Sequence, residues 1–135
     1  MLARCGLGRA ASAPAWDRPP WAVPAGGRRV WGPSGWAYLH SMAISYPQEP
    51  ALCDVHRAGQ LIVDFVARVP CLECVQHITN YILKHPLALD SGDSFQIWVW
   101  RFHNFVNHRL GHRELSLQEY TEHWREEIEA AKALQ

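Results

Sequence analysis

Two cysteines stand two residues apart, directly after a proline, in the stretch Pro70-Cys71-Leu72-Glu73-Cys74. Thiols at this spacing could hold a metal ion, close a structural disulfide or exchange electrons as a dithiol. A disulfide between them would close a very short loop, so it would stabilise the fold little through chain entropy. If Cys71 begins a helix, the unpaired amides and partial positive charge of that helix end favour thiolate over thiol. The spacing therefore favours reversible redox chemistry over a structural staple.

A metal site is the main alternative, because Cys71, Cys74 and His77 follow a C-x-x-C-x-x-H pattern. Structural zinc usually takes four ligands, often as two closely spaced pairs. His108 and His112 are four residues apart, but they fall at the end of a predicted helix among polar residues. A small zinc-binding or adaptor module using Cys71, Cys74 and His77 stays open as the alternative function. A thioredoxin-like enzyme is disfavoured, because no strand–helix–strand pattern surrounds the cysteines.

A second group of residues could bind a flat ligand. Trp36 and His40 are four residues apart, as are His103 and Asn107, so each pair shares one face of a predicted helix. Each of these residues alone could be an ordinary core residue. Together, beside a C-x-x-C pair, they indicate a planar ligand with many hydrogen-bonding atoms. A flavin fits, since it accepts an electron pair from a dithiol and can reduce oxygen.

Helical periodicity must supply the elements that position these residues, and it predicts an all-α fold. No alternating strand pattern is convincing, and no G-x-G-x-x-G follows a strand, so a Rossmann-type site is not expected. Short connections favour a compact antiparallel bundle. The predicted helices cover residues 34–46, 51–69, 71–84, 93–111 and a fifth segment from 116 that carries Tyr120, Trp124 and Ile128.

Helix ends are marked by specific residues. Asp93 or Ser94 could cap the fourth helix, and Gly111 is a natural C-terminal stop. Ser116 and Glu119 have the spacing of a capping box at the start of the fifth helix.

Composition bounds the rest. The chain has 135 residues, 48% of them apolar and seven of them Trp, so it has room for one domain. Residues 1–30 carry five arginines and one aspartate, and their prolines and glycines predict a disordered basic tail. Residues 31–135 carry eight basic and twelve acidic residues, so no nucleic-acid footprint is expected. No stretch is apolar enough to predict a membrane span.

Three motifs together resemble the Erv/ALR family of flavin-linked sulfhydryl oxidases. They are Trp31-Gly32-x-x-x-Trp36-x-x-Leu39-His40, then Pro70-Cys71-x-x-Cys74-x-x-His77, then His103-Asn104-x-Val106-Asn107-x-x-Leu110-Gly111. The resemblance covers about residues 31–125 and implies an FAD-binding sulfhydryl oxidase domain over residues 31–130. It implies a four-helix bundle that cradles FAD, with a short fifth helix packed across it.

The resemblance also implies roles for individual residues. Cys74 would lie against the flavin ring as the charge-transfer thiolate, and Cys71 would be the outer sulfur that exchanges with an incoming dithiol. Arg109 would meet the pyrophosphate and Trp124 the adenine end. The full set of implied cofactor-binding residues is Trp36, His40, Tyr46, Cys74, His77, Trp98, His103, Asn104, Val106, Asn107, Arg109 and Trp124.

The implied activity is FAD-dependent disulfide formation in a dithiol protein, thioredoxin-like or a virion protein, with oxygen reduced to hydrogen peroxide. Members are commonly homodimers, and the apolar faces of the first two helices are candidates for that interface. Many cellular members carry a further disulfide where this chain has Trp100 and Leu117, so apolar packing is expected there. Lone Cys5 and Cys53 cannot form a closely spaced shuttle pair. These departures favour the small single-domain viral members, in host cytoplasm or virion. The basic tail keeps the mitochondrial intermembrane space as the alternative.

Overall fold

The computed structural model describes residues 28–135, and the elements of this part of the chain are all α-helices. Most of the predicted tail, including Cys5, lies outside the described residues. The last three residues of that tail, 28–30, already belong to the first helix. The helices are α1 Arg28–Ile44, α2 Leu52–Arg68, α3 Leu72–Lys84, α4 Gly92–Arg109, α5 Leu117–His123 and α6 Arg125–Ala133.

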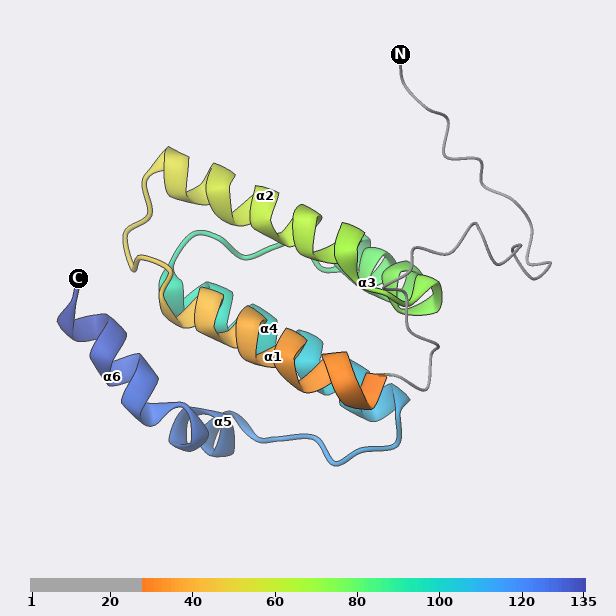
Figure 1. The fold of residues 1–135 in the computed structure, drawn as a ribbon. Coiled ribbons are helices and arrows are strands. Elements are labelled where there is room, and N and C mark those ends of the chain that lie inside the picture. The colour runs from red at the N-terminus through yellow and green to blue at the C-terminus, as the bar shows by residue number, and fades with distance from the viewer. Residues whose placement is uncertain (1–27) are drawn as a thin grey trace, which may run out of the picture.

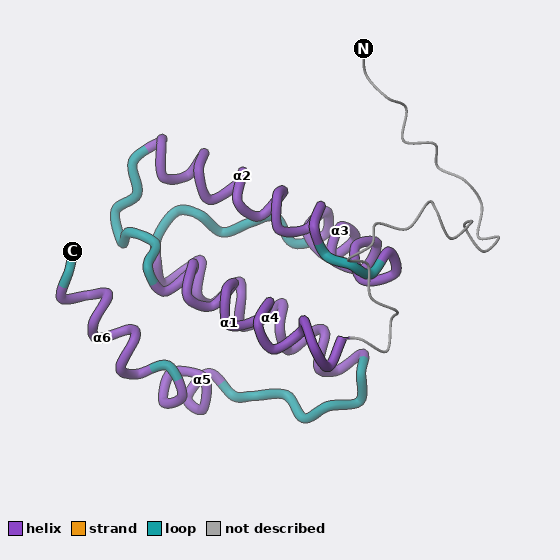
Figure 2. The backbone as a smooth tube through the Cα atoms, viewed as in Figure 1, coloured by secondary structure: helices purple, strands orange, loops and turns teal. Residues whose placement is uncertain are grey.

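The helices form a bundle built from two pairs and a flanking segment. Helices α1 and α4 run side by side, α2 and α3 form the second pair, and α5 and α6 lie along the opposite flank (Figure 1). Loops connect the helices at the two ends of the bundle (Figure 2). The all-α prediction, with four main helices and a further helical segment packed across them, is confirmed. No helix in residues 28–135 is long and apolar enough to cross a membrane.

The first helix differs from its prediction at both ends. It begins at Arg28 rather than near Ser34, and it tolerates Pro33 inside it, where one backbone donor is missing. It ends at Ile44, so Tyr46 lies just beyond the helix rather than in its last turn. The Tyr46 hydroxyl donates a hydrogen bond of 2.9 Å to the Leu89 carbonyl, which ties the end of α1 to the loop before α4.

The predicted fifth helix is two helices, which meet at Trp124. This residue has φ −105° and ψ 17°, and it ends α5 and begins α6. The backbone hydrogen bonds continue on both sides, from Trp124 N–H to the Tyr120 carbonyl and from Ile128 N–H to the Trp124 carbonyl. Trp124 is neither a proline nor a glycine, so the sequence pattern carries no sign of the bend. The half-buried indole packs against His40 of α1, and this tertiary contact accompanies the bend.

The helix caps explain where most of the other elements begin and end. Ser91, not Asp93 or Ser94, caps α4, because its hydroxyl accepts a hydrogen bond from Ser94 N–H. The capping box of Ser116 and Glu119 is confirmed at α5. Gly111 follows the end of α4 with φ +70°, a conformation that favours glycine, and confirms the predicted stop.

The core is dominated by α4, whose Phe95 and Val99 are completely buried. Between α4 and α3, aromatic side chains fill the space. Tyr81 of α3 contacts Trp98 and Phe102, with ring centroids 5.7 and 5.0 Å apart respectively. Large rings of this kind keep two helices apart while still excluding water. The bundle interior is therefore rich in aromatic surface.

Candidate active site

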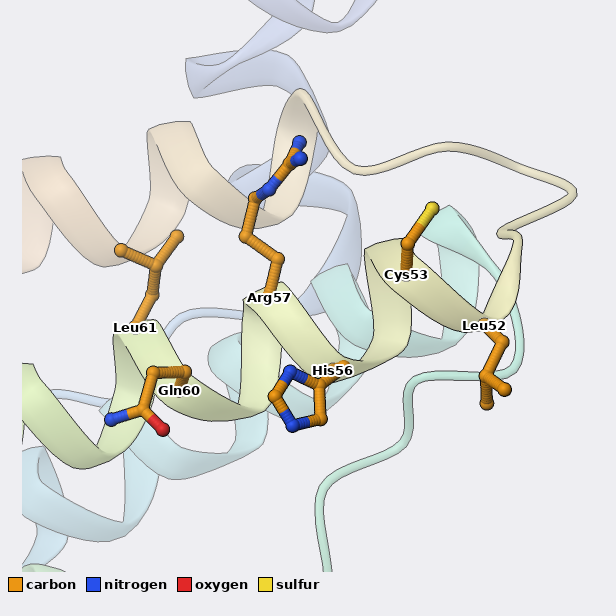
Figure 3. Close-up of a pocket in the computed structure, with 6 residues that line it drawn as sticks. All are labelled: Leu52, Cys53, His56, Arg57, Gln60 and Leu61. Carbon is orange, nitrogen blue, oxygen red and sulfur yellow. The ribbon is translucent and has the colours of Figure 1, made fainter.

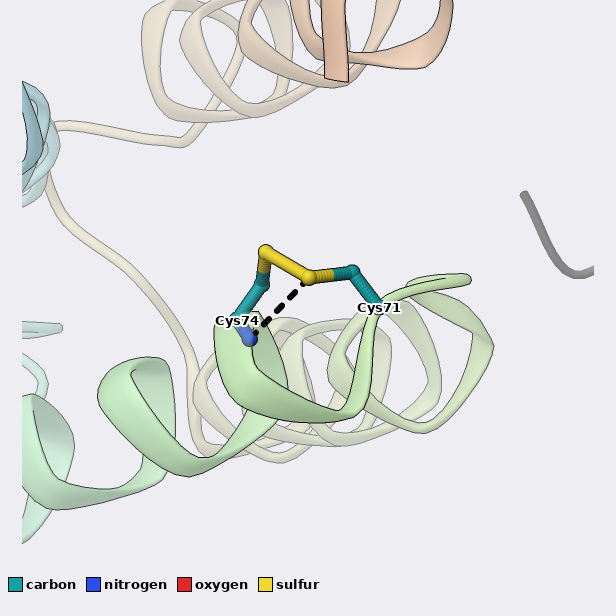
Figure 4. The surroundings of a disulfide bond; sticks show 2 residues. All are labelled: Cys71 and Cys74. Carbon is teal, nitrogen blue, oxygen red and sulfur yellow. Dashed lines mark hydrogen bonds between the residues drawn. A yellow bond between two sulfur atoms is a disulfide. The ribbon is translucent and has the colours of Figure 1, made fainter. Parts of the chain in front are cut away.

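Cys71 and Cys74 form a disulfide at the start of α3, with their Cα atoms 5.2 Å apart (Figure 4). Cys71 is the N-cap residue of α3, as predicted, and its Sγ accepts a hydrogen bond of 3.2 Å from Cys74 N–H. The bond spans three positions of one helix end, so it links no distant segments. Of the possible roles for this pair, a structural staple is the one that the geometry disfavours.

The same arrangement favours negative charge on sulfur after reduction. The Cys74 amide already points at Cys71 Sγ, and the first turn of α3 has further unpaired amides. Amide hydrogen bonds and the helix dipole both stabilise a thiolate. Glu73, between the two cysteines, is exposed and has no hydrogen bond to either. It has the surroundings of a solvated charge rather than of a catalytic base.

The two sulfurs differ in exposure. Cys71 is buried, with 7% of its surface exposed, whereas Cys74 is half-buried and packs against the core. Accessibility alone therefore does not single out Cys71 as the sulfur that meets a partner thiol. The assignment of Cys71 as the outer sulfur and Cys74 as the inner one stays a prediction.

The zinc alternative has no support in the described structure. Among residues 28–135, no three His, Cys, Asp or Glu side chains lie close enough to hold a metal ion. Cys71 and Cys74 are bonded to each other, and His77 is half-buried on the next turn of α3.

A second centre forms where α1 and α4 meet. His40 Nε2 of α1 lies 2.9 Å from His103 Nδ1 of α4. His40 is 2% exposed, and burial, together with His103 and His123 nearby, lowers its pKa to about 3. Burial also lowers the pKa of His103 to about 4. Both rings are therefore neutral at pH 7, and one donates to the other across the pair.

Aromatic rings surround this histidine pair. Trp36 stacks on His103 with ring centroids 3.9 Å apart and an interplanar angle of 10°. On the other side, Tyr120 and Trp124 lie 5.2 and 5.4 Å from His40. The predicted convergence of Trp36, His40 and His103 is present in the structure. We call these five residues, from α1, α4 and the α5–α6 segment, the ring cluster.

The ring cluster holds polar atoms that nothing in the protein satisfies. Within the described residues, His40 Nδ1 and the Tyr120 hydroxyl are buried and have no hydrogen-bond partner. Leaving a buried polar group without a partner costs about 1–3 kcal/mol. Stacked rings next to unused donors and acceptors suit a flat heteroaromatic ligand with polar edges. Tyr120 was not a predicted site residue, and only its place on the buried stripe of the fifth segment could have indicated it.

The remaining residues of α4 divide between support and surface. The Asn104 amide donates to the Leu115 carbonyl at 2.7 Å and accepts from Leu115 N–H at 2.9 Å, so it holds the loop before α5. Asn107 donates to Asn104 at 3.5 Å. Val106 is half-buried against the core, and Arg109 is exposed at the end of α4. A cofactor contact for these residues remains a prediction.

Two tryptophans of α4 hydrogen-bond to backbone carbonyls outside the ring cluster. The Trp98 indole donates to the His85 carbonyl at 2.9 Å, which ties α4 to the end of α3. The Trp100 indole donates to the Leu115 carbonyl at 2.8 Å, while Leu117 is exposed. Where apolar packing of Trp100 with Leu117 was expected, hydrogen bonds to Leu115 make the link instead.

The disulfide and the ring cluster are joined through aromatic side chains rather than directly. Phe102 contacts Trp36 of the ring cluster at 5.2 Å and Tyr81 at 5.0 Å between ring centroids. Tyr81 lies on α3, the same helix whose start carries the disulfide. A ligand that served both centres would have to be elongated.

The largest hollow on the described structure lies away from both centres. It measures about 810 Å³, is open to solvent, and all its lining residues come from α2 (Figure 3). An open face of one helix offers no enclosure for a small ligand. Cys53 on this face is exposed and is not in a disulfide. The lining residues are Leu52, Cys53, His56, Arg57, Gln60 and Leu61.

Comparison with known proteins agrees with this architecture. The sequence profile of the Erv1 / Alr family matches residues 33–125, which include both centres. The chain belongs to the Erv1/Alr family.

Relatives within and beyond this match carry consistent names. A protein of African swine fever virus (isolate Warthog/Namibia/Wart80/1980), an FAD-linked sulfhydryl oxidase, is 39% identical over 90 residues, which is 67% of this chain and 76% of the viral one. The Arabidopsis thaliana FAD-linked sulfhydryl oxidase ERV1 is 30% identical over 80 residues, covering 59% and 42% of the two chains. The crystal structure of the FAD binding domain of Erv1 from Saccharomyces cerevisiae matches with a TM-score of 0.68 for a mutant form and 0.67 for the domain itself. The identities are 26% and 27%, over 73% and 71% of this chain and 83% and 91% of the yeast chains.

Proposed function

We propose that this Erv1/Alr family member is an FAD-dependent thiol oxidase that forms disulfides in a partner protein. The observation that carries the proposal is the Cys71–Cys74 disulfide at the first turn of α3, where the helix end stabilises a thiolate. In a chain of this family, that disulfide is a redox centre rather than a staple. The relatives named as FAD-linked sulfhydryl oxidases support the reaction class.

The residues of the ring cluster fit FAD. Trp36 and His103 already stack, and His40 Nδ1 and the Tyr120 hydroxyl offer unused hydrogen-bonding atoms. The aromatic route through Phe102 and Tyr81 toward α3 suits an elongated cofactor that reaches both centres. Trp36, His40, His103 and Trp124 would hold its flat parts. We propose the remaining contacts from the family resemblance alone, at Tyr46, Cys74, His77, Trp98, Asn104, Val106, Asn107 and Arg109.

The chemistry at sulfur follows thiol–disulfide exchange. A substrate thiolate attacks Cys71 Sγ, the Cys71–Cys74 bond breaks, and Cys74 leaves as a thiolate. The second substrate thiolate then attacks the substrate sulfur of this mixed disulfide and releases Cys71. The substrate dithiol has become a disulfide, and Cys71 and Cys74 have gained its two electrons. When bound, FAD accepts these two electrons and passes them to oxygen, which takes up two protons to give hydrogen peroxide.

The protein itself supports the exchange by stabilising charge. The Cys74 amide donates to Cys71 Sγ in the oxidised state and would keep that bond to a Cys71 thiolate. The start of α3 lowers the free energy of a negative charge on either sulfur. No positively charged side chain is required for this effect.

We propose a dithiol protein as the substrate, thioredoxin-like or a virion protein, and a homodimer as the working form. Exposed apolar side chains on α1 and α2 support the dimer. Tyr38 is 46% exposed and stacks on Phe65 of α2, with ring centroids 5.9 Å apart. We place the protein in host cytoplasm or virion, because the viral relative is 39% identical against 30% for a plant one. The mitochondrial intermembrane space is the alternative, and a mitochondrial relative in Schizosaccharomyces pombe supports it.

The visible absorption spectrum of the purified chain tests the proposed function. We expect flavin bands near about 450 nm that bleach when a dithiol is added and recover in air. Cys53→Ser should behave like the wild type, since Cys53 lies on the outer face of α2. A colourless protein with one bound zinc would discard the oxidase and leave Cys71, Cys74 and His77 as a metal site.

A further inference from the structure

The Tyr120 hydroxyl is a buried polar group with no assigned role. Tyr120 of α5 is 3% exposed, and its hydroxyl has no partner among the described residues. Burial raises its pKa to about 12, so the group stays protonated and can donate a hydrogen bond at any ordinary pH. A tyrosine that only filled space here would not need the oxygen, because phenylalanine has the same ring.

Two sets of hydrogen bonds fix the position of this side chain. Asn104 of α4 holds the Leu115 backbone through both its amide atoms. Directly after Leu115, Ser116 and Glu119 cap the start of α5. The loop and the first turn of α5 are thus anchored to α4, and Tyr120 follows in that turn. Its hydroxyl is therefore held in place rather than free to swing to another partner.

The second unsatisfied atom lies in the same cluster. His40 Nδ1 is buried without a partner, although the His40 and Tyr120 rings are 5.2 Å apart at their centroids. The two groups do not bond to each other. The other nitrogen of His40 is occupied by His103, so His40 cannot turn toward Tyr120 without losing that bond. A third group that bonds to both would satisfy them together.

We propose that the Tyr120 hydroxyl hydrogen-bonds to the bound flavin cofactor and so positions it in the ring cluster. This inference rests on the proposed function. It adds to the cofactor site a residue from α5, an element that is tied to α4 by Asn104 and Trp100. Tyr120 is a binding and positioning residue, because it takes no part in the exchange at Cys71 and Cys74.

Tyr120→Phe in the full chain, purified with its flavin, tests the proposal. Equilibrium dialysis measures the Kd for FAD, and flavin fluorescence on heating measures the temperature of cofactor release. Loss of one neutral hydrogen bond predicts a Kd about three- to tenfold weaker and a lower release temperature. The far-UV circular dichroism melt reports the fold separately. Tyr38→Phe makes the same chemical change on the exposed face of α1 and should leave the Kd at the wild-type value.

The outcomes separate this inference from the proposed function. A weaker Kd in Tyr120→Phe, with an unchanged Kd in Tyr38→Phe, supports the hydrogen bond. If wild type binds FAD and Tyr120→Phe binds it equally tightly, Tyr120 only fills space and the inference is wrong. If the wild-type chain binds no FAD in the same dialysis, the proposed function fails together with it.

Discussion

The two centres of this protein are built in opposite ways. The disulfide centre comes from one short segment, at the start of one helix, and its sulfur already accepts an amide hydrogen bond. The ring cluster comes from α1, α4 and the α5–α6 segment, is buried and neutral, and contains unsatisfied polar atoms. A covalent centre of this kind is complete within the chain, whereas the ring cluster is complete only with a ligand.

The largest effect expected from this difference is at the disulfide centre. Cys74→Ser removes the leaving sulfur but no part of the ring cluster, so turnover should fall at least about 100-fold while flavin stays bound. Oxygen consumption with a dithiol and the flavin absorbance measure the two properties on one sample. Cys53→Ser is the matched control and should keep full turnover. Turnover near the wild-type rate in Cys74→Ser would remove Cys74 from the mechanism.

At the ring cluster the first effect should be on binding. His103→Ala removes the ring stacked on Trp36 and the partner of His40 Nε2, and flavin affinity should fall about 10- to 100-fold. His108→Ala is the control, because His108 lies on the same helix with its side chain 79% exposed. The flavin Kd of each variant makes the comparison. Equal affinities would show that the stacked pair takes no part in cofactor binding.

The buried histidines should also give the cluster a pH signature that the disulfide lacks. Their pKa values are lowered to about 3 for His40 and about 4 for His103 from 6.5. Above pH 6.5 both are neutral whether folded or unfolded, so they add no pH dependence. Below pH 6.5 the unfolded chain binds protons that the folded chain excludes, so the free energy of unfolding falls as pH drops toward about 4.

Urea denaturation of the chain between pH 7.5 and 4 measures this dependence. His40→Gln should flatten the loss by about one proton, and His108→Gln should leave it unchanged. A stability curve with the same slope in His40→Gln and wild type would mean that His40 is not the excluded proton site.

The smallest effect is expected where the sequence places a helix start. Ser116→Ala removes the cap of α5 and should lower the free energy of unfolding by about 1 kcal/mol. Flavin should also be released at a lower temperature, because α5 carries Tyr120 into the ring cluster. Ser41→Ala on exposed α1 surface, whose hydroxyl caps nothing, should be neutral. A Ser116→Ala chain that melts like wild type would indicate that Asn104 alone holds this segment.

The same contrast explains what the sequence could predict. Cys71, Pro70 and the first turn of α3 are contiguous, so helix-capping rules were enough to place the redox pair. Apolar periodicity also placed Trp36, His40 and His103 inside the bundle. Tyr120 and the bend at Trp124 were not predicted, because both depend on contacts with His40 on a distant helix. The hydrogen bonds of Trp100 and Asn104 to Leu115 were likewise invisible, since each joins a side chain to a loop backbone.

An anaerobic dithiol titration of the flavin-loaded chain tests most directly whether the two centres work as one enzyme. The account predicts that about two dithiol equivalents per chain are needed to bleach the flavin completely, one for the Cys71–Cys74 disulfide and one for FAD. Cys71→Ser/Cys74→Ser should stay yellow under the same dithiol. If the double variant bleaches as fast as the wild type, electrons reach the flavin without the disulfide, and the coupling of the two centres is contradicted.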